Sequence, residues 1–243
     1  RELPQIEMIR IGSRLPIVLP HRITEGLKRA IGGFHKVPVW INTQCNHPKE
    51  ITEHTARAVY ELMSCGINVG NQAVLLKGIN DDEIESMIDF AIDRGLDIRF
   101  IETMPIGLAG IEAVDRHYSE KDILERVYTK FGNKLESKKA QQTDGPAKAL
   151  HIIGTNTSVA TISAVSNNFC SSCNRVRLTA KGELILCLGQ KDSVSLRDAL
   201  RSGMSDAEIK QLILNAITKK PEKHFFDSVI DNISSRQMVE IGG

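Results

Sequence analysis

The sequence predicts an α/β fold, an open or partial barrel of parallel strands followed by a smaller α+β domain. Strand-like apolar segments alternate with helical patterns about every 30 residues through residues 1–115. A polar segment rich in Lys and Gly follows at 131–148, and three closely spaced cysteines come after it. We therefore divide the chain into a partial barrel at 1–115, a linker region at 116–148 and a C-terminal domain at 149–243.

The first part is expected to hold four strands of one parallel sheet, because four runs are apolar and rich in β-branched residues. These runs are Ile6–Ile11, Val37–Asn42, Val69–Leu76 and Asp97–Glu102. Helices are expected at Thr52–Cys65 and Asp82–Arg94, where apolar residues recur at helical spacing, and Gly95 should end the second. Four units are too few to close a barrel, and chemistry in such folds gathers at the carboxyl ends of the strands. The segments expected there are 12–14, 43–47, 77–81 and 103–107.

The later part of the chain is expected to mix short strands and helices. Leu150–Ile153 and Val159–Val165 are predicted to form a strand pair. Two amphipathic helices should follow, one starting at Ser195 and the other at Ser205. Glu208 stands three residues after Ser205, which is the spacing of a capping box.

Composition excludes several functional classes. The 31 basic and 30 acidic residues give a net charge of +1, which argues against a nucleic-acid binder. No apolar run approaches the roughly 20 residues that span a bilayer, and no leader pattern is present. We therefore expect a cytoplasmic protein without a nucleic-acid or membrane partner. Because the chain begins at Arg1 instead of Met, we expect it to be a fragment.

The most informative motif is Cys170-x2-Cys173-x13-Cys187, here called the cysteine trio. A two-residue gap lets two thiolates grip one centre, and the third lies at the far end of a predicted hairpin, Val176–Thr179 with Glu183–Leu186. A zinc ribbon needs four ligands, and no fourth Cys or His lies nearby. A disulfide is disfavoured in a cytosolic protein. Spacing alone leaves zinc and a four-iron cluster equally open.

Two arginines, Arg175 and Arg177, stand directly after Cys173; we call them the arginine pair. Alternate residues of a strand point to the same face, so the two guanidinium groups should lie together. Such forks suit phosphate or carboxylate. A solvated strand face is the simpler interpretation of two arginines. Their place beside a centre with three protein ligands instead favours a phosphate-bearing substrate.

The sequence resembles the GTP 3′,8-cyclase family of molybdenum-cofactor synthesis, a branch of the radical S-adenosylmethionine enzymes. The resemblance covers about residues 81–243 and is most specific in SVATISAVSNNFCSSCNRVRLTAKGELILCLG (158–189). Further matching segments are 99–107, 144–148, 200–209 and the terminal IGG. The resemblance implies the C-terminal part of a partial (β/α)6 radical S-adenosylmethionine barrel followed by a small α+β iron–sulfur domain.

The resemblance also implies roles for particular residues. The cysteine trio would bind the substrate-side [4Fe-4S] cluster, and the arginine pair with Val176 would contact GTP. Met104 would lie against S-adenosylmethionine, and the tail Gly242-Gly243 would extend into the active site. A radical derived from S-adenosylmethionine would abstract a ribose hydrogen from GTP, and the sugar carbon would then attack the purine. A homodimer is the assembly to test.

The sequence departs from this family in two ways. The Cys-x3-Cys-x2-Cys motif that binds the radical-generating cluster is absent from these 243 residues, so activity would depend on an N-terminal part that carries it. Residues 5–81 resemble instead the lysine 2,3-aminomutase branch of the superfamily, through IRIGSRLPIVLPHRIT, VWINTQCNHPKEIT and GINVGNQAVLLKGIND. An aminomutase-like enzyme and a non-catalytic metal-binding remnant are therefore the alternatives. His47 is interpreted as a hydrogen-bonding residue, and Cys45 and Cys65 are interpreted as buried thiols.

Overall fold

The computed structural model describes residues 3–32, 36–138, 145–167, 169–222 and 226. The chain divides into two compact units. The first combines Arg1–Glu102 with Tyr118–Ile162, and the second combines Thr103–His117 with Ser163–Gly243. The mixed α/β class predicted from the sequence is confirmed, with a large parallel-rich sheet in one unit and a small antiparallel sheet in the other.

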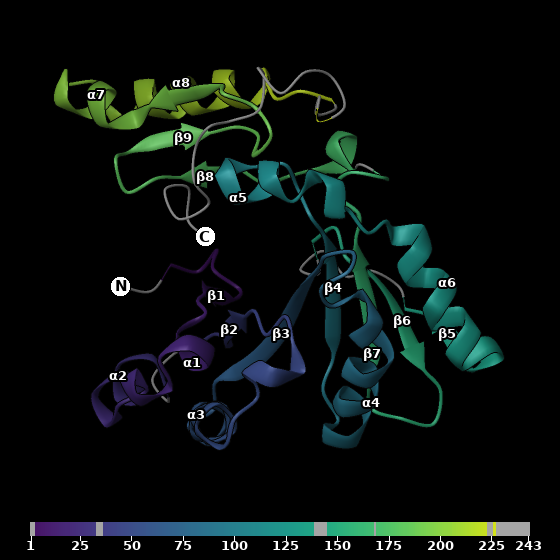
Figure 1. The fold of residues 1–243 in the computed structure, drawn as a ribbon. Coiled ribbons are helices and arrows are strands. Elements are labelled where there is room, and N and C mark those ends of the chain that lie inside the picture. The colour runs from purple at the N-terminus through teal and green to yellow at the C-terminus, as the bar shows by residue number, and fades with distance from the viewer. Residues whose placement is uncertain (1–2, 33–35, 139–144, 168, 223–225, 227–243) are drawn as a thin grey trace. The chain divides into compact units, whose positions relative to one another are not determined.

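Among the described residues, the first unit holds a seven-stranded sheet in the order β1-β2-β3-β4-β7-β6-β5 (Figure 1). Strands β1 to β4 pair in parallel in chain order, β7 adds in parallel to β4, and β6 and β5 complete the sheet antiparallel. The strands are β1 (Ile9–Gly12), β2 (Val39–Thr43), β3 (Asn68–Leu75), β4 (Ile98–Glu102), β5 (Leu135–Ser137), β6 (Lys148–Ile152) and β7 (Ser158–Ile162). All four predicted parallel strands are present, displaced by at most three residues at either end.

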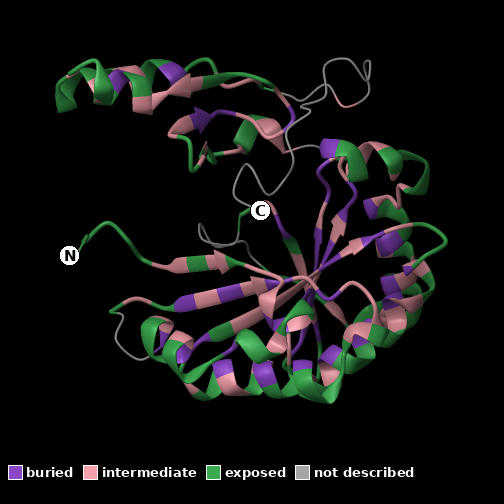
Figure 2. Cartoon of the chain, turned by 60° about the vertical axis from the view of Figure 1, so that its left-hand side comes forward, coloured by how far each residue is buried: buried purple, intermediate pink, exposed green. Residues whose placement is uncertain are grey.

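Helices cover the outer side of this curved sheet, as in a barrel that stays open (Figure 2). They are α1 (Leu15–Val18), α2 (Glu25–Ile31), α3 (Glu53–Ser64), α4 (Ile84–Arg94) and α6 (Glu120–Phe131). A doubly wound sheet would carry helices on both faces, so the one-sided cover agrees with the predicted partial barrel. Single 3-10 turns lie at Pro20–Arg22, Pro48–Glu50, Asp81–Glu83, Val114–Arg116, Gly132–Lys134 and Cys170–Ser172.

Local signals explain where the two predicted helices begin and end. Thr52 caps α3 through a capping box with Thr55, whose hydroxyl accepts from the Thr52 N–H at 2.7 Å. Gly95 ends α4 in the left-handed conformation, at φ 62°, which glycine adopts without steric cost. The predicted start of this helix is corrected: residues 81–83 form a 3-10 turn, and the α-helix begins at Ile84.

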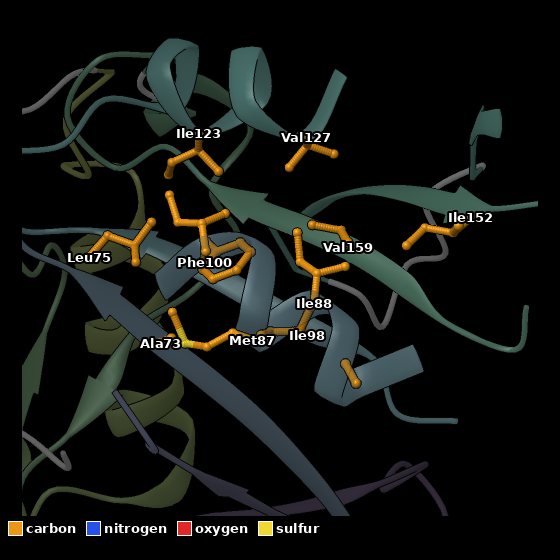
Figure 3. Close-up of a cluster of buried hydrophobic side chains, with 12 residues drawn as sticks. Ala73, Leu75, Met87, Ile88, Ile98, Phe100, Ile123, Val127, Ile152 and Val159 are labelled. Carbon is orange, nitrogen blue, oxygen red and sulfur yellow. The ribbon is translucent and has the colours of Figure 1, made fainter. Parts of the chain in front are cut away.

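The main core of the first unit lies between the sheet and helices α4 and α6. Phe100 on β4 is fully buried, and Figure 3 shows it beside Leu75 of β3 and below Ile123 of α6. Val127 follows Ile123 by one helical turn, so both point into the same cluster. This packing holds the sheet in place. The loops at the carboxyl ends of its parallel strands carry the candidate residues of the first unit.

The region interpreted as a linker, residues 116–148, contains helix α6 and strand β5. Strands β6 and β7 form the predicted antiparallel pair, but they extend the large sheet of the first unit. The boundaries of the compact units therefore differ from the predicted boundaries of 1–115, 116–148 and 149–243. The predicted division stays a sequence-based prediction. The linker interpretation followed the polar composition of 131–148, which includes strand β5 and the first residue of β6.

The second unit contains a small antiparallel sheet in the order β10-β9-β8. Its elements are α5 (Gly107–Glu112), β8 (Arg177–Leu178), β9 (Glu183–Ile185), β10 (Ser193–Ser195), α7 (Leu196–Arg201) and α8 (Asp206–Ile217). The predicted hairpin is confirmed as β8 and β9, which are shorter than expected. Both predicted helix starts are confirmed: Ser195 caps α7, and Ser205 with Glu208 forms the predicted capping box of α8.

The turn of this hairpin requires glycine. Gly182 has φ 80°, and its carbonyl oxygen accepts from the N–H groups of Leu196 and Arg197 at 2.9 and 3.1 Å. A Cβ atom at Gly182 would approach the Arg197 Cβ to 2.7 Å. Leu184, Leu186 and Ala216 then form a small core that packs α8 against β9. Within the described residues, no helix is both long and apolar enough to cross a bilayer.

Candidate functional site

The three cysteines of the trio lie in one part of the second unit. Cys170 begins a 3-10 turn, and the Cys173 N–H donates to the Cys170 carbonyl at 3.1 Å, which reverses the chain between the two thiols. The β8–β9 hairpin returns the chain so that Cys187 lies within electrostatic range of both other cysteines. Across the described part of the chain, no three Cys, His, Asp or Glu side chains converge to enclose a single metal ion. The trio is therefore a neighbourhood of three partly buried thiols, not a closed single-ion site.

Lys220 lies beside this neighbourhood, and no sequence motif pointed to it. Its Nζ donates to the Cys173 Sγ at 3.3 Å, to the Arg175 carbonyl at 2.7 Å and to the Leu186 carbonyl at 3.1 Å. Arg175 follows Cys173 by two residues, and Leu186 immediately precedes Cys187. One ammonium group thus joins the two chain segments that carry Cys173 and Cys187.

The surroundings of Cys173 favour its ionised, thiolate form. Burial raises the pKa of Cys173, but the backbone N–H of Arg175 and the ammonium of Lys220 lower it by more, so the net pKa falls below the usual value. Burial also raises the pKa of Cys187, and the charges of Cys170 and Cys173 add to that rise. Thiolates are the form that binds iron, and N–H donors to sulfur are typical of iron–sulfur sites. Three cysteine thiols in one unit, with N–H donors to one of them, are the donor type that a cluster with three cysteine ligands requires.

The arginine pair lies next to these thiols. The Arg175 guanidinium stacks over the Phe169 ring, 5.1 Å from its centroid, while its backbone carbonyl is bound by Lys220. Burial lowers the pKa of Arg177, and the nearby positive charge of Arg175 lowers it further. Arg177 opens β8 and Arg175 precedes it, so the two do not share the strand predicted for them, although the charge of Arg175 still acts on Arg177. Val176 between them is 40% exposed. Anion binding would relieve the repulsion.

The remaining candidate residues lie elsewhere. Met104 follows β4, and its carbonyl accepts from the Ile106 N–H at 2.8 Å. This carbonyl packs against α5, where a Cβ atom at Gly110 would come within 2.4 Å of it, so only glycine fits. The Met104 side chain is partly buried, and Met104 belongs to the same compact unit as the cysteine trio. Gly242 and Gly243 lie outside the described residues.

The carboxyl edge of the first unit is organised by asparagines that sequence reasoning did not single out. Asn71 of β3 bonds both the N–H and the carbonyl of Cys45, at 2.8 and 3.2 Å. The Val74 N–H donates to Asn46 at 3.0 Å. Asn80, which is 2% exposed, donates to the carbonyls of Asn46 and Val74 at 2.7 and 3.0 Å. Asn46 and Asn80 lie in the segments 43–47 and 77–81 that the sequence predicted at this edge, whereas Asn71 lies within β3 and carried no sequence signal.

His47 in this edge serves as a hydrogen-bonding residue in the structure. Its Nδ1 accepts from the Lys49 N–H at 3.1 Å, and its Nε2 lies 3.9 Å from Glu83. Arg14 from the first predicted loop forms an ion pair with Glu50 and donates to the Gln44 carbonyl at 3.1 Å. These contacts bind the loops after β1 and β2 to each other.

Cys45 lies in the same edge as a buried thiol, 8% exposed. Burial, together with the charge of Glu50, raises its pKa to about 11. At pH 8 about 0.1% of such a thiol is ionised, compared with about a quarter of an ordinary cysteine. We therefore expect Cys45 to alkylate at least about 100-fold more slowly in the folded protein than in urea. Peptide mapping after timed iodoacetamide labelling measures this ratio, and equal rates in both states would contradict the assigned burial.

Comparison with known proteins identifies the family of this chain. Residues 96–226 match the family described as Molybdenum Cofactor Synthesis C. The GTP 3′,8-cyclase of Hydrogenovibrio crunogenus is 48% identical over 205 residues, which cover 81% of this chain and 62% of the relative. The enzyme of the same name from Clostridium perfringens is 34% identical in a match that covers all of this chain and 74% of the relative. The chain belongs to the GTP 3′,8-cyclase family.

Membership of the GTP 3′,8-cyclase family extends over the whole chain, because the Clostridium perfringens match includes the first 80 residues. These comparisons give no support for the aminomutase alternative. The chain spans only part of its relatives: 62% of the Hydrogenovibrio crunogenus protein and 53% of the GTP 3′,8-cyclase from Paracoccus denitrificans, to which it is 38% identical. For this chain, the activity and the substrates of a complete family member are therefore proposals.

Proposed function

We propose that this chain supplies the substrate-side iron–sulfur and GTP-binding part of a GTP 3′,8-cyclase in molybdenum-cofactor biosynthesis. The observation that carries the proposal is that Arg175, whose charge acts on both Arg177 and the Cys173 thiol, lies in the same small unit as the cysteine trio. A cation pair suits a triphosphate, and three thiolates suit a cluster with one iron free of protein ligands.

Different residues of the chain would bind the cluster and the GTP. The cysteine trio would hold a [4Fe-4S] cluster, with N–H donors from Arg175 and Lys220 stabilising the Cys173 thiolate. When bound, such a cluster offers an open iron to which a substrate atom can bind. The arginine pair would hold the phosphates of GTP as bidentate forks, with the Val176 backbone between them. Phe169 would keep the Arg175 guanidinium oriented before GTP arrives.

The other predicted contacts belong to the same proposal. Met104 would lie against S-adenosylmethionine, and Gly242-Gly243 would reach the active site as a tail. The function would be that of a radical S-adenosylmethionine lyase, with its radical-generating cluster held by a motif outside these residues. A homodimer and a cytoplasmic location stay predictions from the sequence.

GTP titration into the anaerobically reconstituted chain tests the proposal. Saturable binding that disappears in the cluster-free protein is the expected result, because the open iron and the arginine pair would act on the same ligand. Equal GTP binding with and without the cluster would contradict a substrate-side role for the cysteine trio.

We also expect this chain by itself to leave S-adenosylmethionine intact. Reductive cleavage needs electron transfer from a cluster that the cofactor itself coordinates, and the three-cysteine motif for that cluster is absent from the 243 residues. Chromatography for 5′-deoxyadenosine, after incubation of the reconstituted chain with S-adenosylmethionine and dithionite, measures this. Product formed at more than the protein-free background would show that the cysteine trio, or another group in the chain, performs the cleavage.

A further inference from the structure

Lys220 uses its full donor capacity around the cysteine trio. A lysine ammonium carries three N–H donors, and here they meet three acceptors: the Cys173 Sγ at 3.3 Å and the carbonyls of Arg175 and Leu186 at 2.7 and 3.1 Å. No carboxylate among the described residues forms an ion pair with it. The positive charge of Lys220 is therefore directed at a thiol and two carbonyls.

The position of the partly buried Lys220 is fixed by the packing of the helix that precedes it. Its backbone N–H donates to the Ile217 carbonyl at 3.1 Å, in the turn that ends α8. Helix α8 is held against β9 by Ala216, which packs with Leu184 and Leu186. The ammonium thus reaches the cysteines from an element anchored to the same hairpin that carries Cys187.

The two carbonyl acceptors belong to the two chain segments that carry Cys173 and Cys187. One belongs to Arg175, just after Cys173, and the other to Leu186, just before Cys187. By holding both, Lys220 sets the separation between the two cysteine-bearing segments. Residues that orient metal ligands and donate hydrogen bonds to cluster sulfurs govern metal retention and reduction potential.

We propose that Lys220 is a positioning residue of the cluster site, which clamps the Cys173 and Cys187 segments together and donates a charge-assisted hydrogen bond to the Cys173 sulfur. This inference rests on the proposed function, since it takes the cysteine trio as the ligands of a four-iron cluster. It assigns Lys220 two effects: slower loss of iron and a less negative reduction potential, because a cation near the cluster favours the added electron.

Lys220→Met tests the inference, since methionine keeps the length and apolar stem of lysine without its charge or donors. The matched control is Lys219→Met, which removes the exposed neighbouring charge. Iron loss to a chelator and the potential of the reconstituted cluster are the measurements. We expect iron retention to fall about 10- to 100-fold in Lys220→Met and the potential to become more negative. Lys219→Met should match the parent protein in both.

A third variant, Lys220→Arg, keeps the charge but replaces the compact ammonium by a planar fork that cannot meet the same three acceptors. Its iron retention should fall by less than that of Lys220→Met, and its potential should stay nearer to that of the parent. If Lys220→Met fails to fold, Lys220→Arg carries the test: retention equal to the parent would overturn the inference.

The outcomes separate this inference from the proposed function. Parent protein that takes up no iron would refute the proposed cluster itself. Parent protein with about four irons, together with a Lys220→Met variant of equal retention and equal potential, would leave the cluster intact and overturn the role of Lys220 alone. An equal loss in Lys219→Met would also overturn it, because the effect would then come from general surface charge.

Discussion

Replacing Cys170, Cys173 or Cys187 by alanine is expected to abolish formation of a four-iron cluster. Each thiolate would ligate a different iron, and a cluster left with two protein ligands would expose two irons to solvent and chelators. The measurement is iron and sulfide content after anaerobic reconstitution, with the absorption spectrum recorded in parallel. Parent protein should hold about four irons per chain, and each variant close to none.

The chain provides matched controls in its two other cysteines. Cys45 lies in the first unit and Cys65 follows α3, so neither belongs to the proposed ligand set. Cys45→Ala and Cys65→Ala should therefore reconstitute as the parent does. Full iron uptake by any variant of the cysteine trio, or a comparable loss in either control, would contradict the assigned ligands.

Loss of either member of the arginine pair is expected to weaken GTP binding about ten- to a hundred-fold. Each charge-assisted phosphate contact contributes about 1.5–3 kcal/mol, and every 1.4 kcal/mol is about tenfold in affinity. Equilibrium titration of GTP against reconstituted Arg175→Ala and Arg177→Ala measures the effect. Lysine at either position should restore only part of the affinity, because a point charge does not replace a bidentate fork.

Arg201→Ala is the matched control for these titrations, since Arg201 is an exposed arginine of the same unit at the end of α7. Its affinity for GTP should equal that of the parent. Unchanged affinity in both variants of the arginine pair would mean that the pair is a solvated face. Losses of equal size for GTP and ATP would assign the pair to the triphosphate and leave base recognition to the open iron.

The sequence predicted the elements whose signals are local. Alternating strand and helix patterns placed β1 to β4, Gly95 marked the end of α4, and the capping box at Ser205 marked the start of α8. Helix α6 was not predicted because the linker interpretation rested on the polar segment at 131–148, although Ile123, Val127 and Phe131 recur at helical spacing and pack into the core around Phe100.

The candidate site was predictable only where its residues are close in sequence. The cysteine trio and the arginine pair lie on one loop and hairpin, so spacing alone brought them together. Lys220 could not be found in this way, because its partners come from a different part of the chain and its contacts depend on how α8 packs on β9. The asparagine contacts of the first unit follow no periodic pattern either, since each one binds backbone groups exposed where a parallel strand ends.

Metal analysis of the unaltered 243-residue chain after anaerobic reconstitution with iron and sulfide tests the central claim most directly. The claim is that the cysteine trio holds an iron–sulfur cluster beside a GTP site. It predicts about four irons and about four sulfides per chain, and a brown protein whose visible absorption bleaches on reduction. One equivalent of zinc per chain, with no iron taken up, would contradict it.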